Sequence, residues 1–388
     1  MADNAAGILL RVIGSLALLT ACGPREQGEA LPTQSYGIDR TQALDTVDIV
    51  RDAAVGVDGE IWMISASPPY LTVVDTRGHV RVSGGRRGRG PTDFLFPFRF
   101  VRASSKASSN GNATFEVLDI GRHQVVSLDS RLTPIRASDL RLIGGSMRAD
   151  MPRLVATLPF AIHSLEDGYL TVALVKNVSN ANDLSAQQVV RIRSGSREVL
   201  WENHETLASA SNWLRPFPLW ASCAGDGLFG VDAEAKHIIH VGMGGRIDST
   251  SLPFNAIRRP VTSADLRVHA RVGVINDLLD ARIPVVEDTV RAAVERFIAR
   301  TSILPADSLP AFASILCADD GALWFQSFDL NDSPLGEGRR WWRVKNASAT
   351  AVILPEAFKA ISVVDGKIIG IVKDSIDVAR LAFASLRR

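Results

Sequence analysis

The chain has 388 residues, of which 46% are hydrophobic and 22% charged, so it can form a packed core and lacks the composition of a disordered protein. Its 43 basic and 42 acidic side chains give a net charge of +1, which excludes the long-range positive field of a typical nucleic-acid-binding protein. Three cysteines, Cys22, Cys223 and Cys317, form neither a disulfide-rich scaffold nor a CxxC zinc pattern.

The N-terminal residues predict export. Residues 12–21 form an apolar run that ends directly before Cys22. The run is much shorter than the roughly 20 residues of a membrane-spanning helix, which favours cleavage over a permanent span. Leu19-Thr20-Ala21-Cys22 resembles the lipobox of bacterial lipoproteins, which implies a signal peptide over residues 1–21 and lipidation of Cys22. An ordinary secretory signal that contains a cysteine is the alternative.

Residues 22–33 are polar and rich in glycine and proline, as in a flexible tether. Acyl chains on Cys22 would anchor the protein permanently, because each buried CH₂ contributes about 0.8 kcal/mol. Gly23 is not the aspartate that resembles an inner-membrane retention signal. We therefore expect a lipid anchor in the outer membrane, with the protein facing the periplasm or the cell surface.

A turn motif recurs along residues 34–388. An acidic residue and a glycine precede an apolar run at Asp58-Gly59, Asp167-Gly168, Asp226-Gly227, Asp320-Gly321 and Asp365-Gly366, and Asn110-Gly111 is a degenerate sixth member. This dipeptide is a strong hairpin signal, because both positions can adopt positive φ. Most intervals are about 45 to 60 residues, near the period of a propeller blade. A plain antiparallel sandwich is the alternative, but it has no reason to repeat the turn at this interval.

Each repeat has room for four strands. The first hairpin is followed by alternating runs over residues 71–75 and 79–83, and the second repeat has runs over 115–119, 124–129 and 135–142. The last repeat has runs over 358–364, 367–372 and 378–384, and is one strand short. Residues 34–40 are expected to supply that strand and close the ring, which would remove exposed sheet edges. The sequence thus predicts an all-β, six-bladed β-propeller.

Three segments carry a family resemblance. Residues 85–97, GRRGRGPTDFLFP, resemble the inter-blade signature of NHL-like propellers, although Thr92 and Asp93 replace the usual Gly and Glu. Residues 116–129, EVLDIGRHQVVSLD, resemble the strand-turn-strand consensus of the same propellers, and the C-terminal third resembles the close of exported propeller lipoproteins. The chain therefore resembles the NHL/TolB-like six-bladed β-propeller lipoproteins of bacteria. The resemblance implies a fold and no settled activity.

The interval between Gly227 and Gly321 is nearly twice the others, which predicts an insertion over residues 258–303 between blades 4 and 5. The insertion is expected to be helical, because Thr262-Ser263-Ala264-Asp265 resembles a capping box. Pro284 separates two pieces, and the apolar face of the second is expected to pack on the rim of the propeller. A lid over the channel is the functional alternative. That face comprises Val290, Val294, Phe297 and Ile298.

Residues with catalytic potential are scattered. The sequence contains no HExxH, GxSxG, P-loop or dinucleotide-binding motif. His237 and His240 are expected on opposite faces of a strand, which makes joint metal binding awkward, and His163 could face the channel. Cys223 and Cys317 occupy the same position in successive blades, and we expect two small buried residues there, because a disulfide needs Cα atoms within about 7 Å.

The densest basic cluster is Arg86, Arg87 and Arg89 in a glycine-rich loop. Guanidinium groups can bind phosphate or carboxylate, so these are the candidate ligand-binding residues, with a solvated loop as the alternative. The leading hypothesis is a non-enzymatic, outer-membrane-tethered binding module for an unidentified protein or glycan, with no cofactor and no nucleic-acid partner. The alternative is a lactonase-like hydrolase or lyase that holds a divalent metal in the axial channel.

Overall fold

The chain divides into two compact units, Met1–Pro32 and Thr33–Arg388. The expected signal peptide, Cys22, most of the tether and the Asn110-Gly111 turn lie outside the residues that the structure describes. The computed structural model describes residues 31–43, 50–56, 59–75, 77–90, 93–103, 115–140, 161–176, 184–193, 196–203, 218–280, 284–300, 308–330, 337–373 and 379–387.

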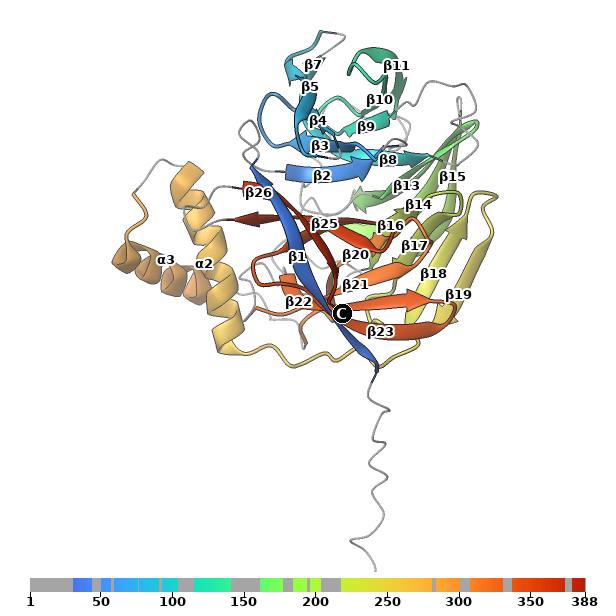
Figure 1. Cartoon of the computed structure of the whole chain (residues 1–388). Coiled ribbons are helices and arrows are strands. Elements are labelled where there is room, and N and C mark those ends of the chain that lie inside the picture. The colour runs from blue at the N-terminus through green and yellow to red at the C-terminus, as the bar shows by residue number, and fades with distance from the viewer. Residues whose placement is uncertain are drawn as a thin grey trace, which may run out of the picture. The chain divides into compact units, whose positions relative to one another are not determined.

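The second unit consists mostly of antiparallel strands (Figure 1). Two of its sheets have four strands each. One has the order β2-β3-β4-β5 and contains β2 (Val50–Val55), β3 (Ile61–Ser65), β4 (Leu71–Val74) and β5 (Val80–Gly84). The other has the order β16-β17-β18-β19 and contains β16 (Leu219–Cys223), β17 (Gly227–Val231), β18 (His237–Gly242) and β19 (Ile247–Ser251).

Two further sheets have eight strands, and each contains one parallel pair that divides it into two antiparallel series of four. The sheet divided between β8 and β12 contains β8 (Pro97–Ala103), β9 (Phe115–Asp119), β10 (Gln124–Leu128), β11 (Pro134–Asp139), β12 (Ile162–Leu165), β13 (Gly168–Lys176), β14 (Leu184–Arg193) and β15 (Ser196–Asn203). The sheet divided between β23 and β1 contains β20 (Phe312–Cys317), β21 (Leu323–Phe328), β22 (Glu337–Lys345), β23 (Ser348–Ile353), β24 (Lys359–Val364), β25 (Lys367–Lys373), β26 (Ala379–Leu386) and β1 (Thr33–Ala43).

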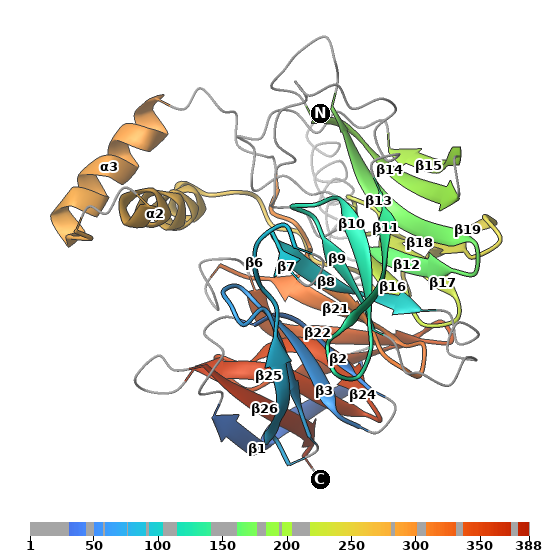
Figure 2. The same ribbon diagram turned by 90° about the horizontal axis from the view of Figure 1, so that it is seen from above.

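The first strands of successive series contact one another in a closed cycle, from β2 through β8, β12, β16, β20 and β24 back to β2. These contacts bring the start of one inner strand to the start of the next, and the end of one to the end of the next. Arg51 at the start of β2 reaches Pro97 at the start of β8, and Asp319 after β20 bonds to the backbone of Val363 near the end of β24. Figure 2 shows the sheets fanning around this inner set. The arrangement is an all-β propeller fold, as predicted.

The cycle gives the propeller two faces. We call the face at which each inner strand turns into its second strand the turn face, and the opposite face the loop face. The connections between successive series, including residues 85–96, begin and end at the loop face. Binding residues in such scaffolds are concentrated on long connections of this kind.

Closure occurs as predicted for residues 34–40. Strand β1 pairs antiparallel with β26 over residues 36–43 and parallel with β23 over residues 33–35. The first described strand therefore completes the last antiparallel series and also joins it to the one before.

The hydrophobic core lies between neighbouring series. One cluster joins Trp62 and Ile64 of β3 to Val117 of β9 and Val126 of β10, and comparable clusters fill most of the other junctions. Trp62, Trp220, Trp324 and Trp341 are among the largest fully buried side chains. At about 25 cal/mol per Å² of apolar surface, such junctions contribute the main favourable term for folding.

The repeated turns take several forms. Asp365 and Gly366 have φ of 50° and 69°, so this turn uses two left-handed positions as expected. Glycine is needed at position 168 for a different reason, because a Cβ there would collide with the carbonyl oxygen of Ile192 in β14. The repeated glycines therefore serve turns of more than one geometry.

The insertion contains α2 (Ser263–Asp280) and α3 (Glu287–Arg300), as predicted. Thr262 and Asp265 form the expected capping box, in which each backbone N–H donates to the side chain of the other residue. The expected packing on the rim is wrong for the main apolar face. Val290 and Val294 of α3 instead pack against Ala270 and Val274 of α2, because two amphipathic helices joined in sequence can cover each other. Among the described residues, Leu266 and Val268 near the start of α2 belong to a cluster that includes Phe328 at the end of β21.

Candidate functional site

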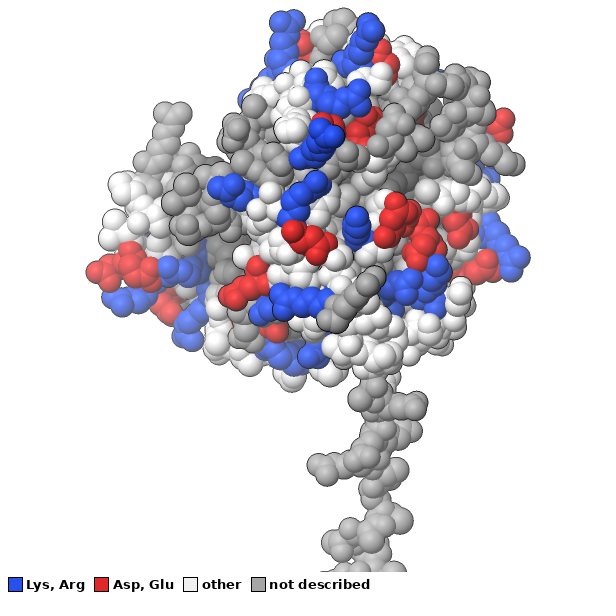
Figure 3. Space-filling model, viewed as in Figure 1, with Lys and Arg blue, Asp and Glu red and all other residues white. Residues whose placement is uncertain are grey.

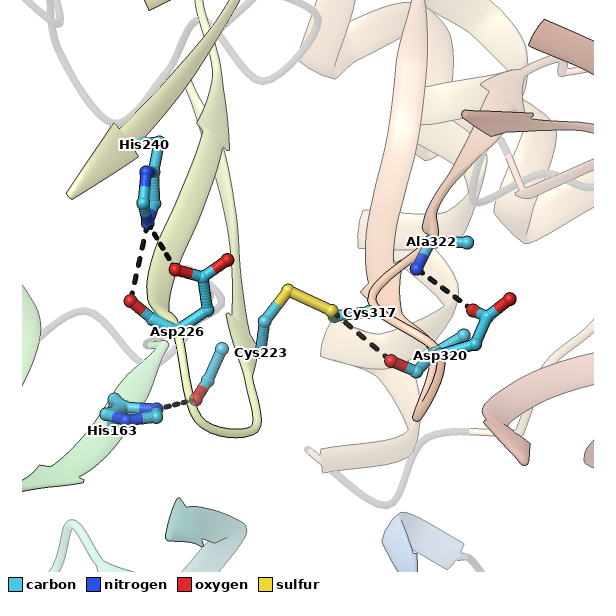
Figure 4. The surroundings of a disulfide bond; sticks show 9 residues. His163, Cys223, Asp226, His240, Cys317, Asp320 and Ala322 are labelled. Carbon is cyan, nitrogen blue, oxygen red and sulfur yellow. Dashed lines mark hydrogen bonds and ion pairs between the residues drawn. A yellow bond between two sulfur atoms is a disulfide. The ribbon is translucent and has the colours of Figure 1, made fainter. Parts of the chain in front are cut away.

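A disulfide joins Cys223 at the end of β16 to Cys317 at the end of β20, on the turn face (Figure 4). Their Cα atoms are 5.3 Å apart. The expectation of two separate buried cysteines is wrong. The packed interface between blades separates their outer strands, whereas inner strands converge on the axis and approach within disulfide distance.

A buried histidine lies beside the disulfide. The Nδ1 atom of His163 in β12 is 3.0 Å from the Oγ atom of Ser222, the residue before Cys223 (Figure 4). Burial lowers the pKa of His163 to about 4, so the ring is neutral near pH 7. Within the described part of the chain, its Nε2 atom has no hydrogen-bond partner. No described carboxylate hydrogen-bonds the ring, so among these residues the pair lacks the third group that orients the base in a hydrolytic triad.

The turn aspartates are paired within their own sheets. Asp167 lies 2.7 Å from Arg193 of β14, and Asp226 lies 3.1 Å from His240 of β18 (Figure 4). Asp320 lies 2.8 Å from Arg343 of β22 and 2.9 Å from Lys345. In each of these three sheets a basic side chain on the third strand faces the carboxylate of the first turn. These turn carboxylates thus have a structural role beyond turn geometry.

Burial acts to raise the pKa of Asp320, but hydrogen bonds from Lys345, the Ala322 backbone and Arg343 outweigh it and lower the pKa to about 2. The carboxylate is therefore ionised at neutral pH and committed to its partners.

The histidines do not converge on a metal site. His237 pairs with Asp232 at 2.9 Å, whereas His240 pairs with Asp226 and stacks on Phe229 with a centroid distance of 4.3 Å. Across the described residues, no group of three His, Cys, Asp or Glu side chains is placed to share a metal ion. In that part of the chain, the carboxylate, histidine and cysteine side chains therefore do not by themselves form the axial metal site of the lactonase-like alternative.

On the loop face, the arginine loop is closed by one buried carboxylate. Asp93 accepts hydrogen bonds from Arg86 Nε at 2.7 Å and from the Gly90 backbone N–H at 2.9 Å. Arg122 donates to the carbonyl oxygens of Gly90 and Asp93, at 3.1 and 2.8 Å. A side chain on Gly88 would collide with the Asp93 carboxylate, so the glycine is required for this closure. The hydrogen bond from Arg86 is the main cause that lowers the pKa of Asp93.

The far end of the same connection is also fixed. Arg51 lies over the ring of Phe96, 3.8 Å from its centroid, and donates to the Pro97 carbonyl oxygen at 3.0 Å. Burial lowers the pKa of Arg51. The connection between β5 and β8 is therefore held at both ends.

The three candidate arginines have different positions. Arg86 is engaged by Asp93, whereas Arg87 and Arg89 are exposed and no carboxylate among the described residues pairs with them. The sequence identified the loop but missed Asp93, which appeared only as a departure from the family signature. Its position seven residues after Arg86 in a glycine-rich loop is the sequence feature that could have indicated this ion pair.

No model of a known protein family matches the chain, and no curated protein matches it in sequence. Solved structures are similar in fold. A member of the DUF4221 family from Bacteroides vulgatus has a TM-score of 0.52 and 9% identity, over 91% of this chain and 97% of its own. A Bacteroides fragilis protein provisionally described as exported has a TM-score of 0.51 and 10% identity, over 92% of this chain and 99% of its own.

A catalytically inactive variant of virginiamycin B lyase from Staphylococcus aureus has a TM-score of 0.45 and 11% identity, over 91% of this chain and 100% of its own. At these identities the likenesses concern the fold alone. Among the described helices, neither is long and apolar enough to cross a membrane.

Proposed function

We propose that the chain is an exported, lipid-anchored β-propeller with six blades that acts as a binding module. The Cys223–Cys317 disulfide is the observation that carries export, because disulfides persist in oxidising compartments such as the bacterial periplasm. The lipobox at Cys22 supplies the anchor. The count of six blades is supported by the closed cycle of inner strands and by the strand β1 that completes the last series.

The contacts of the polar side chains favour binding over catalysis. Asp167, Asp226 and Asp320 are engaged by basic side chains of their own sheets. His163 is buried against Ser222. Arg87 and Arg89, in contrast, project from a loop that Asp93 fixes. Guanidinium groups held in this way are suited to anionic groups such as carboxylate or phosphate.

The anchor is tested by replacing Cys22 with serine in the full chain and separating membranes from soluble protein. We expect Cys22→Ser to leave the membrane fraction or to remain unprocessed. Cys223→Ser is the matched control, because it removes a cysteine and the disulfide but should leave membrane association intact. Unchanged membrane association of Cys22→Ser would refute the lipid anchor.

The binding role is tested against the metal-dependent alternative by elemental analysis of the purified full chain. We expect no divalent metal in stoichiometric amount after dialysis against a low-affinity chelator. One bound metal per chain would instead support the hydrolase or lyase hypothesis.

A further inference from the structure

The arginine loop adjoins a second basic segment that is remote in sequence. A Cβ on Gly84, at the end of β5, would lie 3.6 Å from the Cδ1 atom of Leu132 in the turn between β10 and β11. Leu132 has a φ of 63° and packs against the core cluster between the two sheets. Its neighbour Arg131 therefore lies beside the loop that carries Arg87 and Arg89.

The surface formed by these segments is basic. Arg87, Arg89 and Arg131 are exposed, as is Arg136 on β11, and no carboxylate among the described residues forms an ion pair with them. We call these four residues the arginine surface. Figure 3 shows Lys and Arg side chains projecting from this end of the second unit, over β5, β7 (Asp93–Phe94) and β11.

Two carboxylates of these segments are already engaged. Asp129 accepts the backbone N–H groups of Arg131 and Thr133 at 2.9 and 2.8 Å, and Asp93 is held by Arg86. These carboxylates thus fix the segments in place. The arginine surface consequently presents several cations on a rigid frame, which reduces the entropy lost when a ligand binds.

We infer that the arginine surface binds an anionic polysaccharide, whose carboxylate or phosphate groups pair with Arg87, Arg89 and Arg131. A polymer with repeated charges fits several exposed cations spread over two blades better than a single small anion does, because each contact adds to the same binding event. The inference rests on the proposed binding role and names its ligand class.

A glycan is favoured over the anchoring membrane by the position of β1. This strand leads from the tether, and it starts at the foot of the second unit in Figure 1, whereas β7 and β11 lie at its head. The end of β1 that follows the tether is therefore on the opposite side of the second unit from the arginine surface. A nucleic acid is disfavoured by the net charge of +1 and by export.

The test measures binding of the full chain, purified in detergent, to heparin and to alginate, with uncharged dextran as the blank. We expect binding to at least one anionic polysaccharide and weakening as sodium chloride is raised, because salt screens exposed charges. The triple variant Arg87→Ala, Arg89→Ala, Arg131→Ala should lower the affinity about tenfold, since each exposed ion pair contributes modestly. The corresponding triple lysine variant should retain part of the binding.

The matched control removes three exposed arginines elsewhere, with Arg246→Ala, Arg291→Ala and Arg296→Ala. This control changes the net charge by the same amount as the test variant. It should leave the affinity within about twofold of the wild type, because charges distant from the binding surface are screened at physiological salt. An equal loss in both triple variants would overturn the inference, because the effect would then be one of total charge.

Two further results would also overturn it. One is failure of both polysaccharides to bind, and the other is binding only to vesicles that contain phosphatidylglycerol or only to inorganic phosphate. Neither would contradict the proposed binding role itself, which fails if a stoichiometric metal is found.

Discussion

The carboxylate of Asp93 lies 2.7 Å from Arg86 Nε and also accepts the backbone N–H of Gly90, so one buried side chain closes the loop between them. Asp93→Ala should open this loop while leaving the propeller folded, because the surrounding sheets do not depend on it. We expect faster trypsin cleavage after Arg87 and Arg89, measured by mass spectrometry of early fragments. Cleavage after Arg246, in a different turn, is the internal reference and should not change.

The disulfide should contribute substantially to stability. Cys223 and Cys317 are separated by 94 positions, and closing a loop of that length restricts the unfolded chain. Cys317→Ser should lower the free energy of unfolding by about 2 to 5 kcal/mol, measured by urea denaturation. The double variant Cys223→Ser, Cys317→Ser should lose about as much as the single one, because both lack the same bond. A reductant that leaves wild-type stability unchanged would contradict the bond.

Burial of His163 predicts a pH dependence. Its pKa is lowered from 6.5 to about 4, so the unfolded chain binds more protons than the folded chain between these values. Stability should therefore fall as the pH is lowered from 6.5 towards 4, by up to roughly 3 kcal/mol from this group. His163→Gln and His163→Asn should flatten the profile of urea midpoints.

Ser222→Ala provides the control for this profile. It removes the hydrogen-bond partner of His163 but keeps the titrating ring, so it should lower stability by about 1 kcal/mol at both ends of the range. A flattened profile in Ser222→Ala would show that the slope does not come from the imidazole.

The helical insertion depends on its first turn. Asp265 receives two hydrogen bonds from Arg259 and one from the Thr262 backbone, and the bonds from Arg259 are the main cause that lowers its pKa below the ordinary 3.8. Asp265→Asn should lower the free energy of unfolding by about 1 kcal/mol at pH 7. The difference from wild type should persist above pH 3.8 and shrink as the pH falls further, because the unfolded wild-type chain then binds a proton that the folded chain, with its lowered pKa, does not yet bind. Arg291→Ala, which removes an exposed ion pair, should have no measurable effect.

Local pattern was sufficient to predict most strands. The run over residues 115–119 matches β9, and the run over 367–372 falls within β25, because alternating apolar residues and an adjacent turn specify a hairpin without distant information. The closing role of residues 34–40 followed from counting strands, since a propeller that lacks one strand has an obvious vacancy.

Contacts between distant residues could not be read in the same way. The approach of Cys223 to Cys317 depends on the convergence of inner strands, which equal spacing from a hairpin glycine does not reveal. The mutual packing of α2 and α3 depends on their relative direction, and the amphipathic pattern of Val290 and Val294 fits either partner. For the candidate site, the sequence identified Arg86, Arg87 and Arg89, but Arg131 joins them only through the fold.

The pairing of strand β1 depends on a strand near the other end of the second unit. Its residues 36–43 pair with β26, and Asp39 accepts a hydrogen bond from Ser385, which lies 346 positions later. Strand β1 therefore finds its main partner only after β26 has been synthesised. A chain truncated before β26 would keep most of β1 as a bare edge, open to proteolysis. Fully paired β1 thus marks a chain that extends at least through β26.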